Sequence, residues 1–506
     1  MADASENAVS EEEGIVAKLR AQHSFLGHPK AIGTLSFMQL CNSFSNYGMQ
    51  AILVYYLYTS VAEGGLGLAK ADAAQLMSLY SAVLLLCGLV GSVMADRVLG
   101  PRRALRLARL SQTIGYALLA LPFLGIVGYA ACMGFLLFAT MLCGRSVEAL
   151  INKMYTAADE RRDGAFSIAY VISNVGALST FVTGSMALVT GYSLAFALCA
   201  VLAFLGFAAY VVTEKKFFGP VGVEPDDPMD PAKRRRFLTI LGCCIVAVVV
   251  VLSVLFSTGT LAVSTFANSV SSVALVVPVA YFAYVVKSKK TKPEEARHLM
   301  GLIPLFVCNC LAMLVYTQSV SILAIYAETT VDRNLFGLEI TPAAFQTLSA
   351  IFAIAFGSVA TALWTKIGDK QPSTPAKTAI GTVLYAASVL LMVVPFLLYP
   401  AGVKVSPLWL VGYYAIMTAG EVLINPSGYS ASAAVAPAAF STQMITVWSL
   451  NWSVGAGLST LAVNFYHEGG EAQYFFVMGA ITLVAGVVVW AFSKRLNHSM
   501  GLDEAR

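Results

Sequence analysis

Charged residues are scarce in this sequence of 506 residues. Asp, Glu, Lys and Arg make up 12% of the chain and hydrophobic residues 58%, whereas soluble domains carry about 25% charged residues. Long stretches, such as residues 237–256, contain no charge at all. A stretch of that length spans roughly 30 Å as a helix, the thickness of the hydrocarbon core, and a helix pairs every backbone polar group within lipid. The sequence therefore predicts an all-α membrane protein.

Several functional signals are also missing. The nine cysteines suggest no disulfide framework and have no zinc-like spacing, because most lie in apolar stretches, including the adjacent Cys243 and Cys244. No nucleotide-binding loop, pair of catalytic carboxylates or nucleophile elbow is evident. The basic residues lie in loops, where membrane topology explains them better than nucleic-acid binding does. We therefore expect no enzyme, no cofactor, no metal site and no nucleic-acid partner.

Fourteen hydrophobic segments follow one another along the chain. The even number places both termini on one side of the membrane. If that side is cytoplasmic, only Lys70, Arg333 and Lys404 of the 32 basic residues face outward. We expect a multi-pass protein of the cell membrane with both termini in the cytoplasm. The predicted segments are 33–59, 73–95, 104–126, 129–150, 165–189, 192–213, 236–256, 261–286, 299–327, 342–366, 376–399, 405–430, 440–466 and 471–494.

The longest polar connection, residues 214–235, follows the sixth segment. The seventh and eighth segments are joined by only a few residues, which indicates an inserted hairpin and a 6 + 2 + 6 arrangement. Two six-helix bundles with the substrate near the midplane are typical of secondary transporters. The predicted divisions are an N-terminal tail (1–32), a first bundle (33–213), a loop, hairpin and linker (214–298), a second bundle (299–494) and a C-terminal tail (495–506).

Five stretches carry a family resemblance that extends from residue 30 to about 495. They are ERRDGAFSIAYVISNVGAL (160–178), MTAGEVLINPSGYSASAAVAP (417–437), FSNYGMQAIL (44–53), DRVLGPRR (96–103) and VDRNLFG (331–337). Together they resemble the proton-dependent oligopeptide transporter (POT) family of the major facilitator superfamily. The resemblance implies the major facilitator fold and proton-coupled import of di- and tripeptides by alternating access.

The sequence departs from that family where charges usually couple transport to protons. The family's Glu-x-x-Glu-Arg-Phe pattern of the first helix reads Gln39, Asn42 and Ser43 before Phe44. Its other usual groups are replaced as follows: the lysine of helix four by Gly144 with Arg145 beside it, the glutamate before Gln318 by Thr317, the paired tyrosines by Asn46 and Tyr47, and the next arginine by Gln50. Neutral polar residues thus replace many of the charged residues that couple transport to protons in the family.

The first helix carries a polar stripe, which consists of Gln39, Asn42, Ser43, Asn46 and Gln50. Their spacing of three and four residues places them on one helical face. Amides that face lipid are costly, so the stripe lines a cavity or forms hydrogen bonds with neighbouring helices. None of its members titrates near neutral pH.

Ionisable residues within membrane segments are default candidates for function. Arg145 and Glu148 have i, i+3 spacing and can pair on one face. Either they form a structural ion pair, or Arg145 holds a substrate carboxylate while Glu148 takes a proton. Glu421 has no basic neighbour in the sequence, and the resemblance assigns it to the amino group of a peptide. A carboxyl that only packs is the alternative.

The remaining candidates rest on the resemblance. Asn174, Tyr47, Gln318 and Trp448 match family substrate-site positions, although interhelical hydrogen bonding or simple packing also explains such residues. Asp96, Arg97, Arg102 and Arg103 belong to the superfamily motif between helices two and three, and we expect them to act in gating.

These observations favour a monomeric importer of short peptides. Glu148 and Glu421 are the available proton carriers, if coupling to protons survives in this chain. The altered first helix keeps open a facilitator or exchanger of another small zwitterionic or organic solute. A non-transporting membrane sensor on a transporter scaffold is the third possibility.

Overall fold

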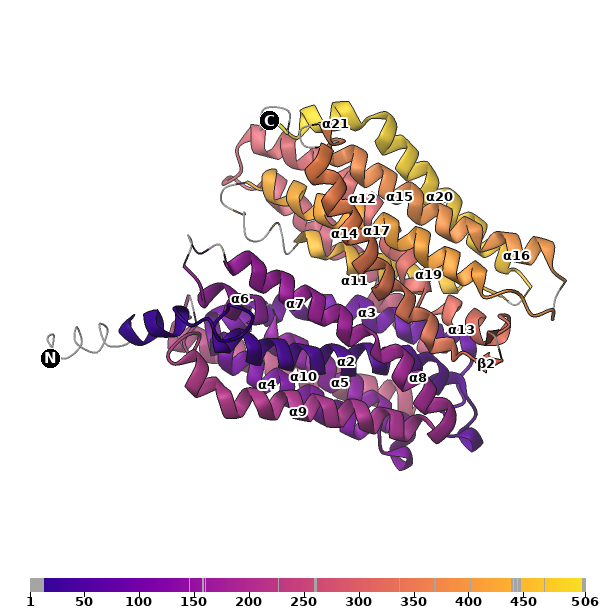
Figure 1. The fold of residues 1–506 in the computed structure, drawn as a ribbon, viewed down its shortest axis with the longest axis horizontal. Helices are drawn as coiled ribbons and strands as arrows, with labels where there is room; N and C mark the ends of the chain where they lie inside the picture. Colours follow the sequence, from indigo (N-terminus) through magenta and orange to yellow (C-terminus); the bar gives the residue numbers. More distant parts are fainter. Residues whose placement is uncertain are drawn as a thin grey trace, which may run out of the picture. The chain divides into compact units, whose positions relative to one another are not determined.

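The computed structural model describes residues 13–144, 146–156, 159, 161–225, 227–258, 262–335, 337–367, 370–400, 402–437, 440, 444, 447–467 and 469–502. Most of these residues are helical (Figure 1). The described strands form a small hairpin in which β1 (Asn334–Leu335) pairs antiparallel with β2 (Leu338–Glu339), so that Asn334 faces Glu339. This architecture confirms the predicted helical fold.

The chain forms two compact units. The first comprises Met1–Met49, Cys87–Ser179 and Val189–Ala262, and the second comprises Gln50–Leu86, Thr180–Leu188 and Val263–Arg506. Three helices have residues in both units: α2 (Lys30–Tyr58), α3 (Lys70–Val93) and α8 (Ser179–Thr190). The units therefore do not follow chain order, and the sequence-based division into two bundles and an insertion stays a prediction.

The first unit contains the following further elements: η2 (Met94–Leu99), α4 (Pro101–Leu119), η3 (Pro122–Leu124), α5 (Gly125–Cys143), α6 (Ser146–Lys153), α7 (Arg161–Ala177), α9 (Tyr192–Phe218) and α10 (Pro231–Ser257). Its largest described core joins Leu35, Met38, Leu150, Tyr210 and Phe218. Small residues let these helices approach closely, as is usual in membranes. A Cβ on Gly206 of α9, for example, would lie 2.8 Å from the Cβ of Cys41 on α2.

The second unit contains the following further elements: η1 (Val61–Glu63), α11 (Val263–Lys287), α12 (Pro293–Gln318), α13 (Ile322–Thr329), η4 (Pro342–Gln346), α14 (Thr347–Ile367), α15 (Thr374–Leu391), α16 (Val393–Leu398), α17 (Leu408–Ala434), α19 (Asn451–Val463), α20 (Glu471–Ala491) and α21 (Ser493–Ser499). Helix α15 packs against α17 and α20 (Figure 1). A Cβ on Gly420 of α17 would lie 2.7 Å from the carbonyl oxygen of Gly381 on α15.

Eleven helices in the described parts of the chain are long and apolar enough to cross a membrane. Three predicted segments are not among these eleven. In α2 the polar stripe lowers the hydropathy, and α4 carries Arg102, Arg103, Arg106 and Arg109. The segment 440–466 includes residues outside the described ranges. The total of fourteen spans therefore stays a prediction.

Each helix of the predicted hairpin packs on its own unit. Phe237 and Leu241 of α10 pack on a small core around Met94 and Val98. Helix α11 approaches α19, where a Cβ on Gly457 would lie 3.3 Å from the carbonyl oxygen of Ser271. Most of the remaining described length of α10 is exposed, as an apolar helix that faces lipid would be.

Candidate transport site

The polar stripe of α2 makes interhelical hydrogen bonds in its first half. Gln39 Nε2 donates to Ser173 Oγ of α7 over 3.0 Å. Asn42 Oδ1 accepts a hydrogen bond from Arg109 Nη1 of α4. Asn46 and Gln50, further along α2, are half-buried. At Gln39 and Asn42 the stripe therefore connects α2 to its neighbours, which is one of the two arrangements predicted for it.

Sequence reasoning missed Arg109. Its side chain is 8% exposed, and it donates to Gln112 Oε1 over 2.6 Å in addition to Asn42. A buried guanidinium within a helix that is predicted to cross the membrane is a candidate for function, because such a charge has to be paired to be tolerated. The signal was present in the sequence, since Arg102, Arg106 and Arg109 follow one another at i, i+4 and i+7 and so share one helical face.

Helix α7 lies against α2 because Gly176 leaves room. A Cβ on Gly176 would come 2.5 Å from the Cβ of Ser43 and 2.9 Å from the backbone nitrogen of Phe44. Asn174, two residues earlier, is half-buried and donates from Nδ2 to the Tyr170 carbonyl oxygen over 3.0 Å. Tyr47 of α2 is 38% exposed. The roles of Asn174 and Tyr47 in substrate binding stay predictions.

Of the predicted pair Arg145 and Glu148, only Glu148 belongs to the residues that the structure describes. Glu148 is an exposed residue of α6, which begins after Gly144. Arg145 lies outside the described residues. The predicted contact between Arg145 and Glu148 is therefore neither supported nor contradicted by the structure.

In the second unit, Glu421 lies midway along α17. Its Oε1 accepts a hydrogen bond from Asn425 Nδ2, one turn later, over 3.3 Å. Its side chain is half-buried. The close packing of Gly420 on Gly381 fixes this part of α17 against α15. Pro426, which has no backbone N–H, removes one intrahelical hydrogen bond next to Asn425. A carboxylate paired with an amide here can hold a cationic group or a proton.

Gln318 and Trp448 are fully buried in the second unit. Gln318 Nε2 donates to Ser459 Oγ over 2.9 Å, and its Oε1 accepts from the Tyr474 hydroxyl over 3.1 Å. Trp448 lies against α17, where a Cβ on Gly428 would be 2.1 Å from its Cζ2. Both residues thus join helices in this structure, and their contact with substrate stays a prediction.

Among the residues of the superfamily motif, Asp96, Arg97 and Arg102 have separate partners. Arg97 pairs with Asp227 over 2.6 Å, and both side chains are exposed. Arg102 is 6% exposed, donates to the Gly219 carbonyl oxygen and lies over the ring of Phe218. Arg103 is exposed. Asp96 and Arg97 also hold the chain that follows α9, because their carbonyl oxygens accept from the backbone nitrogens of residues 227 and 229. Their predicted gating role is not tested by these contacts.

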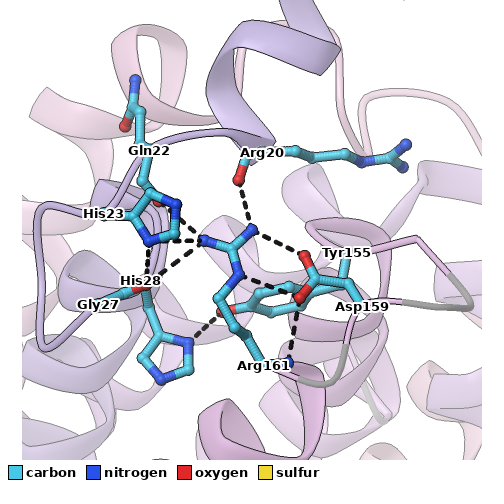
Figure 2. A network of polar contacts seen from close by, with 8 residues as sticks. All are labelled: Arg20, Gln22, His23, Gly27, His28, Tyr155, Asp159 and Arg161. Carbon is cyan, nitrogen blue, oxygen red and sulfur yellow. Dashed lines mark hydrogen bonds and ion pairs between the residues drawn. The ribbon is translucent and has the colours of Figure 1, made fainter.

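The start of α7 forms a polar network with the chain before α2 (Figure 2). Arg161, the first residue of α7, is its centre. Its Nη2 donates to Asp159 Oδ2 over 2.7 Å and to the Arg20 carbonyl oxygen over 2.9 Å. Its Nη1 reaches the carbonyl oxygen of Gln22 over 3.2 Å. One guanidinium therefore attaches the N-terminal segment to the start of α7, because its fork of donors can serve several acceptors.

His28 and Tyr155 extend this network (Figure 2). His28 Nδ1 lies 2.7 Å from the Tyr155 hydroxyl. Burial lowers the pKa of His28 below its ordinary value, and the positive charge of Arg161 lowers it further, against the opposing effect of Asp159. Burial raises the pKa of Tyr155 to about 12. The hydrogen bonds from Arg161 lower the pKa of Asp159. At neutral pH the network is therefore a neutral His–Tyr pair beside an Arg–Asp ion pair.

The comparisons with known proteins agree with one another. The sequence matches the POT family over residues 110–495. The uncharacterized transporter YclF of Bacillus subtilis (strain 168) is 33% identical over 96% of this chain and 98% of its own length. A di-/tripeptide transporter of Lactococcus lactis subsp. cremoris is 32% identical over 95% of this chain and 98% of its own. A crystal structure of the peptide transporter POT in complex with sulfate covers 97% of this chain and 99% of that chain, with a TM-score of 0.93 and 35% identity.

Proposed function

The chain belongs to the POT family of membrane transporters, and we propose on this basis that it imports di- and tripeptides by alternating access. The observation that supports the substrate most strongly is the nearly full-length similarity to a protein named as a di-/tripeptide transporter. Since members of the family are transporters, the chain is a transporter and not an enzyme.

Two charged residues suit the ends of a short peptide, which is a zwitterion. Glu421, already hydrogen-bonded to Asn425 over 3.3 Å, is the partner we propose for the amino group. Arg145 is the partner we propose for the carboxylate, because a guanidinium binds a carboxylate through two parallel donors. The neutral lining that we propose consists of Asn46, Tyr47, Gln50, Asn174, Gln318 and Trp448.

A second candidate function follows from the neutral first helix. Gln39 and Asn42 are held by hydrogen bonds to Ser173 and Arg109, where the family's usual pattern has titratable glutamates. These contacts favour an exchanger or facilitator of small zwitterionic solutes, in which Glu148 and Glu421 are the candidate proton carriers.

Transport by the purified protein in liposomes tests these proposals. Uptake of radiolabelled dialanine should be inhibited by unlabelled di- and trialanine and not by free alanine. Flux of another zwitterion without dialanine flux would favour the second candidate. Binding of dialanine without any flux would favour a sensor and would contradict both transport proposals.

We further propose that the protein is a monomer in the cell membrane. We also propose that both termini lie in the cytoplasm, because this orientation leaves few basic residues outside. A fluorescent protein fused to the C-terminus should mature only if that end is cytoplasmic. Light scattering of the protein in detergent should give the mass of one chain, 53.7 kDa, after subtraction of the detergent.

A further inference from the structure

A basic cavity lies in the first unit, where the start of α4 meets the end of α9. Its volume is about 310 Å³, and its charged lining consists of Arg102, Arg103, Arg106, Lys215 and Glu214. Four basic side chains thus face one carboxylate. A cavity with this surplus of positive charge attracts an anion.

Two of the four basic side chains of this cavity are already engaged by protein groups, and in the described part of the chain two are not. Glu214, which is buried, accepts from Arg106 Nη1 over 2.9 Å, and Arg102 is bound to the Gly219 carbonyl oxygen. Arg103 and Lys215 are exposed and have no partner among the residues that the structure describes. These two cations are therefore available to a ligand, while Arg102 and Arg106 shape the wall behind them.

The face of α4 that carries Arg103 continues as an apolar stripe. Leu107, Leu110 and Ile114 follow at i+4, i+7 and i+11, so they lie below Arg103 on one face. They are 39%, 39% and 38% exposed, respectively. On a helix that is predicted to cross the membrane, exposed apolar side chains of this kind would face lipid chains.

Helix α9 repeats the same pattern. Val212, Leu205 and Val201 precede Lys215 by three, ten and fourteen residues and share its helical face. They are 79%, 45% and 54% exposed. Both stripes end at a cation of the same cavity, and α4 packs against α9. A ligand with a charged head and apolar chains would fit both parts at once.

We propose that this cavity binds the headgroup of an anionic phospholipid, with its phosphate on Arg103 and Lys215 and its acyl chains along the stripes of α4 and α9. Guanidinium groups bind phosphate through paired donors, and basic pockets between membrane helices suit lipid headgroups. The apolar stripes favour a lipid over free phosphate, since phosphate alone would leave them unused. The bound lipid would join α4 to α9 and stabilise the first unit.

Thermal unfolding in a neutral detergent tests the proposal with three probes. Dihexanoyl-phosphatidylglycerol should raise the melting temperature in a saturable manner, and dihexanoyl-phosphatidylcholine at equal concentration should not. Inorganic phosphate should have a much weaker effect. An equal effect of phosphate would show a free-anion site, and an equal effect of phosphatidylcholine would show that the charges play no part. Either result would overturn the proposal.

A matched pair of double variants locates the site. Arg103→Gln with Lys215→Gln should weaken the apparent affinity for phosphatidylglycerol roughly tenfold or more. Lys494→Gln with Arg495→Gln removes the same charge from exposed positions of α21 and should leave that affinity unchanged. Equal weakening in both variants would mean that only the net charge matters. The single change Arg103→Lys, which keeps the charge and loses the paired donors, should weaken the affinity less than the double variant.

Discussion

At the scale of single residues, Glu421 is the residue to which we assign the most specific proposed role. It is a half-buried carboxylate on a membrane helix, with the amide of Asn425 at 3.3 Å. The glycine contact between α17 and α15 fixes the backbone beside it. An ionisable side chain in this position is costly for the fold unless it binds something.

Replacing Glu421 by Gln should lower peptide uptake while the protein still inserts and folds. Loss of one charge-assisted contact costs about 1.5–3 kcal/mol, which corresponds to roughly ten- to a hundredfold in affinity. The measurement is dialanine uptake into liposomes at several concentrations. Glu294→Gln, at an exposed position in the first turn of α12, is the matched control and should transport normally. Wild-type uptake by the Glu421 variant would rule out its assignment to the amino group.

Gly428 provides a test of packing at a single residue. Its substitution by Ala would place a Cβ 2.1 Å from Trp448 Cζ2, and Trp448 is fully buried. The ring or the helix has to move, which typically costs about 1–3 kcal/mol. We expect a lower melting temperature in detergent for Gly428→Ala. Gly134→Ala, on α5 with no atom within 4 Å of the new Cβ, should cause no loss. Equal stability of the two variants would mean that Trp448 is not held against α17.

At the scale of elements, Arg161 joins the N-terminal segment to the start of α7, and the contact between His28 and Tyr155 joins it to the chain after α6. The groups that act on the charge of His28 are Arg161, Asp159 and His23. Burial and the nearby guanidinium both disfavour a charged imidazole here. The stability of this junction should therefore depend on pH.

The sign of that dependence follows from the lowered pKa of His28. In the unfolded chain His28 has its ordinary pKa of about 6.5, so as the pH falls it takes up a proton at a higher pH than in the folded protein. Stability is therefore fully present above about pH 6.5 and falls as the pH drops through 6.5 toward the folded pKa. We expect the melting temperature of the wild type to decrease over this range. His28→Gln, which keeps a hydrogen-bonding group, should decrease less, whereas His467→Gln at an exposed position should behave as the wild type. Identical slopes in all three proteins would contradict this role of His28.

At the scale of the whole molecule, the main functional question is how strongly transport is coupled to protons. A proton-driven carrier needs a group that changes its protonation during the cycle. Gln39, Asn42 and Ser43 of the first helix and Thr317 of α12 cannot do so. Thr317 donates instead to the Met313 carbonyl oxygen over 2.8 Å. Of the site residues predicted to lie well inside the membrane, only Glu148 and Glu421 remain as proton carriers.

Transport should therefore depend on a pH gradient more weakly than in relatives that keep the glutamates of the first helix. If Arg145 holds Glu148 ionised, Glu421 has to bind both a proton and the amino group, which suits exchange better than symport. The measurement is dialanine accumulation in liposomes with an acidic outside, with and without an ionophore. Concentrative uptake that the ionophore abolishes would contradict weak coupling.

The sequence by itself determined the helical membrane fold and the family. Within lipid, every backbone polar group of a segment has to be paired inside that segment. Apolar runs and loop charges therefore predict each segment without knowledge of the others. The same local periodicity predicted the polar stripe of α2 from Gln39 to Gln50. The charge of Glu421 within an apolar segment marked it as a candidate, whereas Asn174 came from the family motif, because pattern alone would not have separated it from packing residues.

Only the tertiary structure decided which distant side chains meet. Arg109 reaches Asn42, Gln318 reaches Ser459, and Arg161 reaches the chain before α2. Each contact joins segments far apart in the sequence and depends on how closely two helices approach. Glycines such as Gly176 and Gly420 set that approach through the space that they leave. The pattern of residues along one helix carries no information about which helix packs against it. The contact partners of these side chains could therefore be identified only from the tertiary structure.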